Sequence, residues 1–161
     1  MACLRSAAAP LRLAFLLERQ NAFVGVFRLQ RLGADKGGEE PETLAPHLTA
    51  PTGLALSSDD IFVGDGDAVY RRGKRGCPDT LEPVVTGVTR PSLLAADGRH
   101  VYFTERFDAG LWPLRRADVL RRKPLLDILP DTVDPGFVYT VTDEWLVHGR
   151  TTGNTIRRFR L

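Results

Sequence analysis

The chain has 161 residues, which is the length of about one domain, and its 43% hydrophobic and 26% charged residues exclude intrinsic disorder over most of that length. Its net charge of only +2 excludes the large basic field that draws nucleic acid, so we expect no nucleic-acid partner. Fifteen glycines and eleven prolines favour an all-β chain with many turns over a helical one.

The N-terminal residues 1–12 predict no defined element, and the apolar run that follows, residues 13–17, is shorter than the about 7–15 residues of a signal-peptide core. No segment approaches the roughly 20 apolar residues of a membrane span. We therefore expect a soluble chain without a signal peptide, in a compartment that the sequence does not assign. Cys3 and Cys77 are too few for a disulfide framework and form no CxxC pair.

Residues 13–50 read as a degraded copy of a repeat. Strands are predicted over residues 13–17, 26–32 and 41–44, and no strand is recognisable before them.

Three clearer copies follow, each anchored by a proline and, ten residues later, by a triplet of β-forming residues. The prolines are Pro51, Pro91 and Pro135, and the triplets are residues 61–63, 101–103 and 145–147. An apolar residue stands three places after each proline, and polar turn residues precede each triplet. The copies begin 40 and 44 residues apart, which is the spacing of four-stranded propeller blades.

Each copy is interpreted as the same series of strands. The first strands are predicted at 53–56, 92–96 and 137–141, and the triplets form the second strands. The third strands are predicted at 68–72, 111–115 and 155–159, and the fourth strands at 83–86 and 124–129. The prediction is an all-β β-propeller of about three and a half to four four-stranded blades, partial or small, with blades at approximately 13–50, 51–90, 91–134 and 135–161. A β-sandwich would also have short strands, but it would not show this repeat in the sequence.

With these residues in place, the pattern resembles the YWTD and NHL-like propeller repeats, including the six-bladed TolB-like group. Pro91, Leu94, Ala95, Asp97 and residues 101–105 follow the P-x-x-L-A-x-D-x-x-x-V-Y-W-T-D pattern, and residues 25–29 with 37–45 follow the stretch after it. The resemblance implies a propeller, and its relatives include receptor ectodomains, lactone hydrolases, lyases and many bacterial proteins.

The acid that closes the motif varies between the copies. It is interpreted as Asp65, one place late, in the first clear copy and as Glu105 in the second, and it is absent in the third, where His148 and Gly149 stand. A role that needs a uniform ring of acids is therefore not expected.

Three arrangements would complete the ring of blades. In the first, the chain is a fragment of a six- to eight-bladed protein. In the second, two chains form a homodimer that completes one ring. In the third, four blades close alone, with residues 1–9 adding an outer strand to the last blade.

Binding sites in propellers lie in the loops between second and third strands and between blades. These loops are polar and differ between copies, as adaptable binding loops do. The candidate binding residues are Glu18, Arg19, Asp65, Asp67, Glu105, Arg106, Asp108, His148 and Arg150.

No catalytic constellation is recognisable in these loops. Asp65 and Asp67 supply two carboxylates on one turn, whereas calcium takes about 6–8 oxygen ligands, so an exposed turn is favoured over a metal site. His148 has no identifiable partner for general-base chemistry. No nucleophile elbow, phosphate loop or zinc spacing is found, and no metal or cofactor is expected.

The sequence favours a non-catalytic binding or interaction scaffold, which recognises a protein or a small-molecule ligand, over an enzyme. The alternatives are a fragment of a lactonase- or lyase-like propeller enzyme and a truncated remnant without independent activity. Fold analogy alone does not decide between them.

Overall fold

The computed structural model describes residues 13–19, 27–33, 42–74, 80–106, 113–120, 123–129, 139–142, 144–150 and 155–160. These residues form strands and turns only, and no helix among them has the length and apolar character needed to cross a bilayer. The described part of the chain is therefore all-β, as the sequence predicts.

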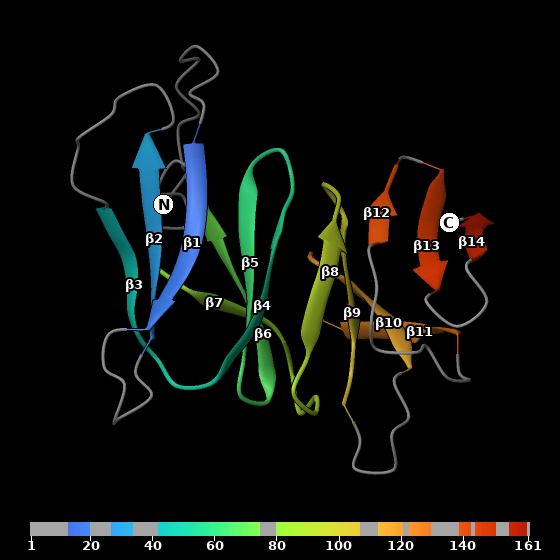
Figure 1. The fold of residues 1–161 in the computed structure, drawn as a ribbon. Helices are drawn as coiled ribbons and strands as arrows, with labels where there is room; N and C mark the ends of the chain where they lie inside the picture. Colours follow the sequence, from blue (N-terminus) through green and yellow to red (C-terminus); the bar gives the residue numbers. More distant parts are fainter. Residues whose placement is uncertain are drawn as a thin grey trace.

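The described residues form four antiparallel sheets that follow one another along the chain (Figure 1). Sheet β1–β3 comprises Leu13–Arg19, Phe27–Gly33 and Glu42–Leu48. Sheet β4–β7 comprises Pro51–Leu56, Asp60–Asp65, Ala68–Gly73 and Glu82–Thr86. Sheet β8–β11 comprises Ser92–Ala96, His100–Thr104, Leu114–Asp118 and Lys123–Leu129. Sheet β12–β14 comprises Tyr139–Val141, Trp145–Arg150 and Thr155–Arg160.

Within each sheet the strands lie side by side in chain order, and the sheets stand in a row (Figure 1). Strands β1, β4, β8 and β12 contact one another from sheet to sheet, so the first strand of each sheet lies at its inner end. The hydroxyl of Thr52 on β4 donates to the carbonyl of Pro91, which stands just before β8.

The turn between the first two strands has the same construction in three sheets. Ser57, Asp97 and Thr142 each donate their backbone N–H to the carbonyl three residues on, over 2.8–3.0 Å. Their side-chain oxygens accept the N–H of that same residue, from Asp60, His100 and Trp145. Such local side-chain hydrogen bonds favour turns over continued strands, which explains why each strand ends there.

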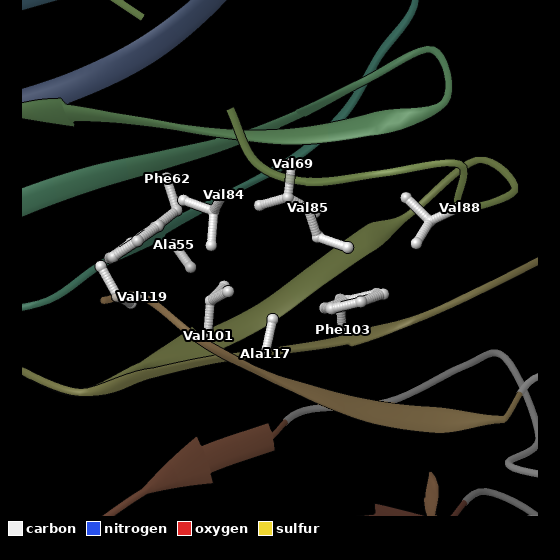
Figure 2. Packing of buried hydrophobic residues seen from close by; sticks show 10 residues of the cluster. All are labelled: Ala55, Phe62, Val69, Val84, Val85, Val88, Val101, Phe103, Ala117 and Val119. Atoms are coloured by element: carbon white, nitrogen blue, oxygen red, sulfur yellow. The ribbon is translucent and has the colours of Figure 1, made fainter. Parts of the chain in front are cut away.

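Apolar side chains from neighbouring sheets form two cores. One lies between sheets β1–β3 and β4–β7 and contains Leu29, Leu44, Ala45, Leu48, Ile61 and Val63. The other lies between β4–β7 and β8–β11; Figure 2 shows its members, Ala55, Phe62, Val69, Val84, Val85, Val88, Val101, Phe103, Ala117 and Val119. Neighbours along a strand point to opposite faces, so Phe62 and Val63 serve different cores. Each buried valine or phenylalanine contributes roughly 1.5–3 kcal/mol, which holds one sheet against the next.

One sequence prediction of strand position was wrong. The third strand of the third sheet was predicted at 111–115 but lies at Leu114–Asp118, because the strand pairs in register with β9 from Thr104 opposite Leu114 to His100 opposite Asp118.

In the last copy the second strand lies where the sequence predicts it, but its alignment with the other copies is shifted by one residue. Val141 pairs with Leu146, as Leu56 pairs with Ile61 and Ala96 with Val101. Leu146, rather than Trp145, is therefore the equivalent of Ile61 and Val101. The proline spacing missed this because one extra residue precedes the turn.

Candidate functional site

The candidate site is the rim where each second strand ends and the chain crosses from one sheet to the next. We call residues 49–51, 65–67, 87–91 and 105–106 the connection rim. The carboxylates of Asp65 and Glu105 bond to the crossings at 49–50 and at 89, so these segments lie together.

Asp65 holds the crossing between the first two sheets. Its Oδ1 accepts the backbone N–H of Ala50 at 2.6 Å and that of Thr49 at 3.1 Å. Gly66, with a positive φ of 62°, donates its own N–H to the carbonyl of Ala50 over 3.2 Å. Glycine suits this left-handed conformation because it has no Cβ. The Asp65 carboxylate therefore fixes the backbone of the rim.

Glu105 holds the next crossing from a fully buried position, with 1% of its surface exposed. Its Oε1 accepts the N–H of Thr89 at 2.7 Å, and its Oε2 lies 2.5 Å from Nη1 of Arg115. Arg106 then donates its N–H to the carbonyl of Thr89 over 3.0 Å. A buried carboxylate needs such partners, since an uncompensated charge away from water is costly.

The two acids occupy equivalent positions, so the interpretation of Asp65 as one place late was wrong. Asp65 and Glu105 each stand fourteen residues after the proline of their copy. Both accept backbone N–H groups from the residues just before that proline. Counting from the aligned second strands, Glu18 and Arg150 take the same place in the first and last sheets.

Other predicted residues fall into two groups. Asp67 and Arg106 are exposed on the rim. Asp108 lies outside the described residues, as do the side chains of Glu18, Arg19, His148 and Arg150, whose backbones lie on β1 and β13. The binding role of all nine stays a prediction.

Sequence reasoning missed Arg90, which is also exposed on the rim. Its backbone has a positive φ of 44°, an uncommon conformation for a residue other than glycine. The signal was available, because Arg90 stands where the preceding copy has Ala50, and Arg106 where it has Gly66.

A polar cluster on the opposite rim was also missed, because only a turn was expected at His100. Asp97 Oδ1 accepts the N–H groups of Arg99 and His100 at 2.6 Å, and Oδ2 lies 3.2 Å from the Tyr102 hydroxyl and 3.5 Å from His100 Nδ1. Burial acts to raise the pKa of Asp97, but these hydrogen bonds and nearby His100 together lower it below its usual value.

The same contacts act in the opposite direction on Tyr102. Burial, the charge of Asp97 and the hydrogen bond to it raise the pKa of Tyr102 to about 12, against a smaller opposing effect of Arg116. Tyr102 therefore stays a neutral donor to an ionised carboxylate, which makes the cluster a rigid brace for the turn.

Within the described residues, no group of three or more histidine, cysteine, aspartate or glutamate side chains is arranged to hold a metal ion. The two acids of the connection rim whose contacts are described bind backbone and arginine instead.

Sheets of three or four antiparallel strands in a row, each packed on the next, define the chain as a partial β-propeller. TolB from Acinetobacter baumannii is similar to it, with a TM-score of 0.69 and 18% identity over 94% of this chain. The computationally designed Ika4 protein has a TM-score of 0.56 and 14% identity, over 85% of this chain and 86% of the designed one.

The chain spans only 39% of the TolB chain. Its fold is that of a TolB-like propeller, and at these identities the likeness concerns the fold alone. No protein-family model matches the sequence, and the comparison with curated proteins gave no match.

Proposed function

We propose that the chain is a non-catalytic binding scaffold whose connection rim engages a protein or small-molecule ligand. The main support is that some residues of the connection rim hold its backbone while others are exposed to solvent. Asp65 and Glu105 are committed to holding the crossings, while Asp67, Arg90 and Arg106 are exposed around them.

The exposed positions change between copies although the framework does not. Arg90 and Arg106 of one copy stand where the preceding copy has Ala50 and Gly66, beside the same crossing and the same closing acid. A constant backbone that carries variable exposed side chains is how loops on rigid scaffolds acquire specific ligands. Two guanidinium groups favour ligands with carboxylate groups, which arginine binds in a forked geometry.

The test is a selection of phage-displayed random peptides on the whole chain, followed by affinity measurements on the enriched peptides. We expect these peptides to be rich in acidic residues and to lose about tenfold in affinity when Arg90→Ala and Arg106→Ala are combined, since charge-assisted hydrogen bonds each contribute roughly 1.5–3 kcal/mol at most and less when exposed.

The matched control is Arg99→Ala, which removes an exposed arginine from the opposite rim. It should leave the affinity unchanged. Peptides that bind all variants equally, or that respond to Arg99→Ala instead, would contradict a role for the connection rim. Thermal unfolding of each variant establishes that the fold is retained.

A further inference from the structure

The outer strands β3, β7 and β11 each contain one proline. These prolines are Pro46, Pro83 and Pro124. In the other described strands proline occurs only at Pro51, the first residue of β4. No described strand pairs with the far side of β3, β7 or β11, and such an edge accepts a residue without an N–H. Residues 1–9, which were expected from the sequence to add an outer strand to the last blade, lie outside the described residues.

The sequence repeat does not account for these prolines, because they stand at different places in the repeated unit. Pro83 lies opposite Tyr70, and the equivalent pair in the first sheet is Thr43 opposite Gln30. The proline of that sheet, Pro46, stands three residues after Thr43. A copied unit would keep its proline at one place. What recurs instead is one proline on each of these three strands.

The nitrogen of Pro83 faces away from its sheet. Opposite residues in antiparallel strands alternate between pairs that exchange two backbone hydrogen bonds and pairs that exchange none. Because proline cannot donate, Pro83 and Tyr70 form a pair of the second kind, in which both nitrogens point outward. The neighbouring ladder agrees with this. The N–H of Lys74 donates to the carbonyl of Asp59 over 2.8 Å, and by alternation from there Tyr70 exchanges its bonds with Val63 on β5.

The nitrogen of Pro124 faces outward for the same reason. Pro124 lies opposite Ala117 on β10. The N–H of Val119 donates to the carbonyl of Arg99 over 2.8 Å, and by the same alternation Ala117 exchanges its bonds with Val101 on β9. Ala117 therefore bonds away from β11, and the backbone nitrogen opposite it points to the free side of the sheet.

The pairing of the same three strands is also irregular. The register shifts between β2 and β3, between β6 and β7 and between β10 and β11, and Pro46 lies at one of these shifts. Pairing between the second and third strands runs without a shift in each of the four sheets. A bulge bends a strand and turns its edge away from a straight strand that could pair with it.

The residues beside the prolines would otherwise favour pairing with another chain. Strand β7 has the sequence EPVVT, and β11 has the sequence KPLLDIL. Valine and isoleucine are among the strongest strand formers. A run of such residues on an unpaired edge is a template for the addition of a further strand.

We propose that these prolines, with the register shifts beside them, close the outer edges of the propeller to strand addition by a second copy or by an extended partner. Each outward-facing proline removes a donor that an added strand would need, and its ring occupies the position of the missing hydrogen. The inference does not rest on the function proposed for the connection rim. It leaves side-chain contacts, rather than backbone pairing at these edges, as the means by which this molecule binds.

The experiment compares the 161-residue chain with the double variant Pro83→Thr, Pro124→Thr. Threonine is the residue at the place in the first sheet equivalent to Pro83, and it restores an outward N–H without a purely apolar side chain. Sedimentation velocity at a series of concentrations measures self-association. We expect the double variant to associate at concentrations about tenfold lower than the original chain, because two edges regain a backbone donor.

The contact is located by hydrogen exchange. Backbone amides of β7 and β11 should gain protection in the associated double variant. The matched control is Thr86→Val, which places a β-branched apolar residue at an exposed position of β7 and leaves the number of backbone donors unchanged. This control should associate like the original chain.

Three results would overturn the proposal. In the first, the double variant associates no more than the original chain at any concentration. In the second, it associates without added protection in β7 or β11. In the third, Thr86→Val associates to the same extent, which would assign the effect to apolar surface. If the double variant does not fold, Pro83→Thr alone, at an exposed position, provides the same comparison with an expected effect of about threefold.

Discussion

The same strand-end position carries two acids in very different surroundings. Glu105 is buried against Arg115 and Thr89, whereas Asp65 is half-buried and bonds to the backbone and hydroxyl of the crossing before it. Stability should therefore depend on the first more than on the second, although the sequence places both at the same point of the repeat.

We expect Glu105→Gln to lower the free energy of unfolding by about 2 kcal/mol, because it removes a buried negative charge that lies against the partly buried Arg115 guanidinium. Asp65→Asn should cost about 1 kcal/mol or less, since its amide oxygen still accepts a backbone N–H. Urea denaturation of both variants makes the comparison, and equal losses would contradict the difference in burial.

His47 and Gly87 occupy equivalent places before the two crossings and both have positive φ, 65° and 72°. A side chain is disfavoured in this conformation by roughly 1–2 kcal/mol. We expect His47→Gly to raise the free energy of unfolding by about 0.5–1 kcal/mol, after the entropy of an extra glycine is subtracted.

The matched change at the equivalent site is Gly87→Ala, which should lower that free energy by about 1 kcal/mol. Nothing lies within 4 Å of a Cβ built on Gly87, so the cost would come from the backbone conformation and not from a clash. Urea denaturation again provides the measurement. Opposite signs for the two variants are the expected signature.

The sequence predicted the two acids but not the residues that they contact. Both acids were recognised from their place after the second strand. The partners of Glu105 stand sixteen residues before it and ten residues after it, and were not predicted. A side chain's burial depends on such distant contacts, which local pattern does not contain. The exposure and the positive φ of Arg90 likewise follow from the crossing, although its place in the repeat, where the preceding copy has Ala50, marks it as a rim residue.

For the strands, the local residue pattern predicted most positions correctly. Each predicted second strand is present, because β-branched and aromatic residues in a run fit a pleated and buried surface. The third strand of the third sheet was displaced, since residues 111 and 112 are apolar and suggested an earlier start than Leu114. Pairing with β9 decides its position, and pairing is not a local property.

The turn before β9 should make stability sensitive to acid. The pKa of Asp97 is lower in the folded protein than in the unfolded chain, so its ionised form stabilises the fold at pH above the unfolded value. That contribution is lost as the pH falls through the folded pKa. We expect Asp97→Asn to reduce the loss of stability between neutral pH and about pH 3, the range that contains the ordinary titration of aspartate.

Urea denaturation at a series of pH values measures this difference. The variant should be less stable than the original at neutral pH, and the two curves should converge in acid. Parallel curves over the whole range would show that Asp97 does not contribute to the acid response. Ser57, the equivalent residue in the preceding sheet, has no charge, so Ser57→Ala should shift its curve uniformly.

For the whole molecule, stability depends on contacts between sheets, and Phe62 lies in the core that joins the two four-stranded ones (Figure 2). We expect Phe62→Ala to lower the free energy of unfolding by about 3–5 kcal/mol, as for other large-to-small changes in cores. Leu56→Ala, on a side chain that is 41% exposed, should cost less than about 1 kcal/mol. Similar losses would mean that the stability of the molecule does not depend on the core between these two sheets.

The repeat predicted the number and order of the sheets, because every copy repeats the same strands. How a ring is completed was left open by the sequence, and assembly of two chains into one ring stays a prediction. Light scattering tests it, since a dimer stable on dilution would support it and a monomer at all concentrations would contradict it. A contact between chains leaves no local pattern, which is why the sequence could not choose.

Sheets that contact mainly their neighbours in sequence make the molecule behave as a one-dimensional array. In such an array a sheet with two neighbours opens only after one with a single neighbour, so unfolding should proceed inward from both ends. Amides of β5 and β9 should exchange with solvent at the rate of global unfolding, and those of β1 and β13 faster.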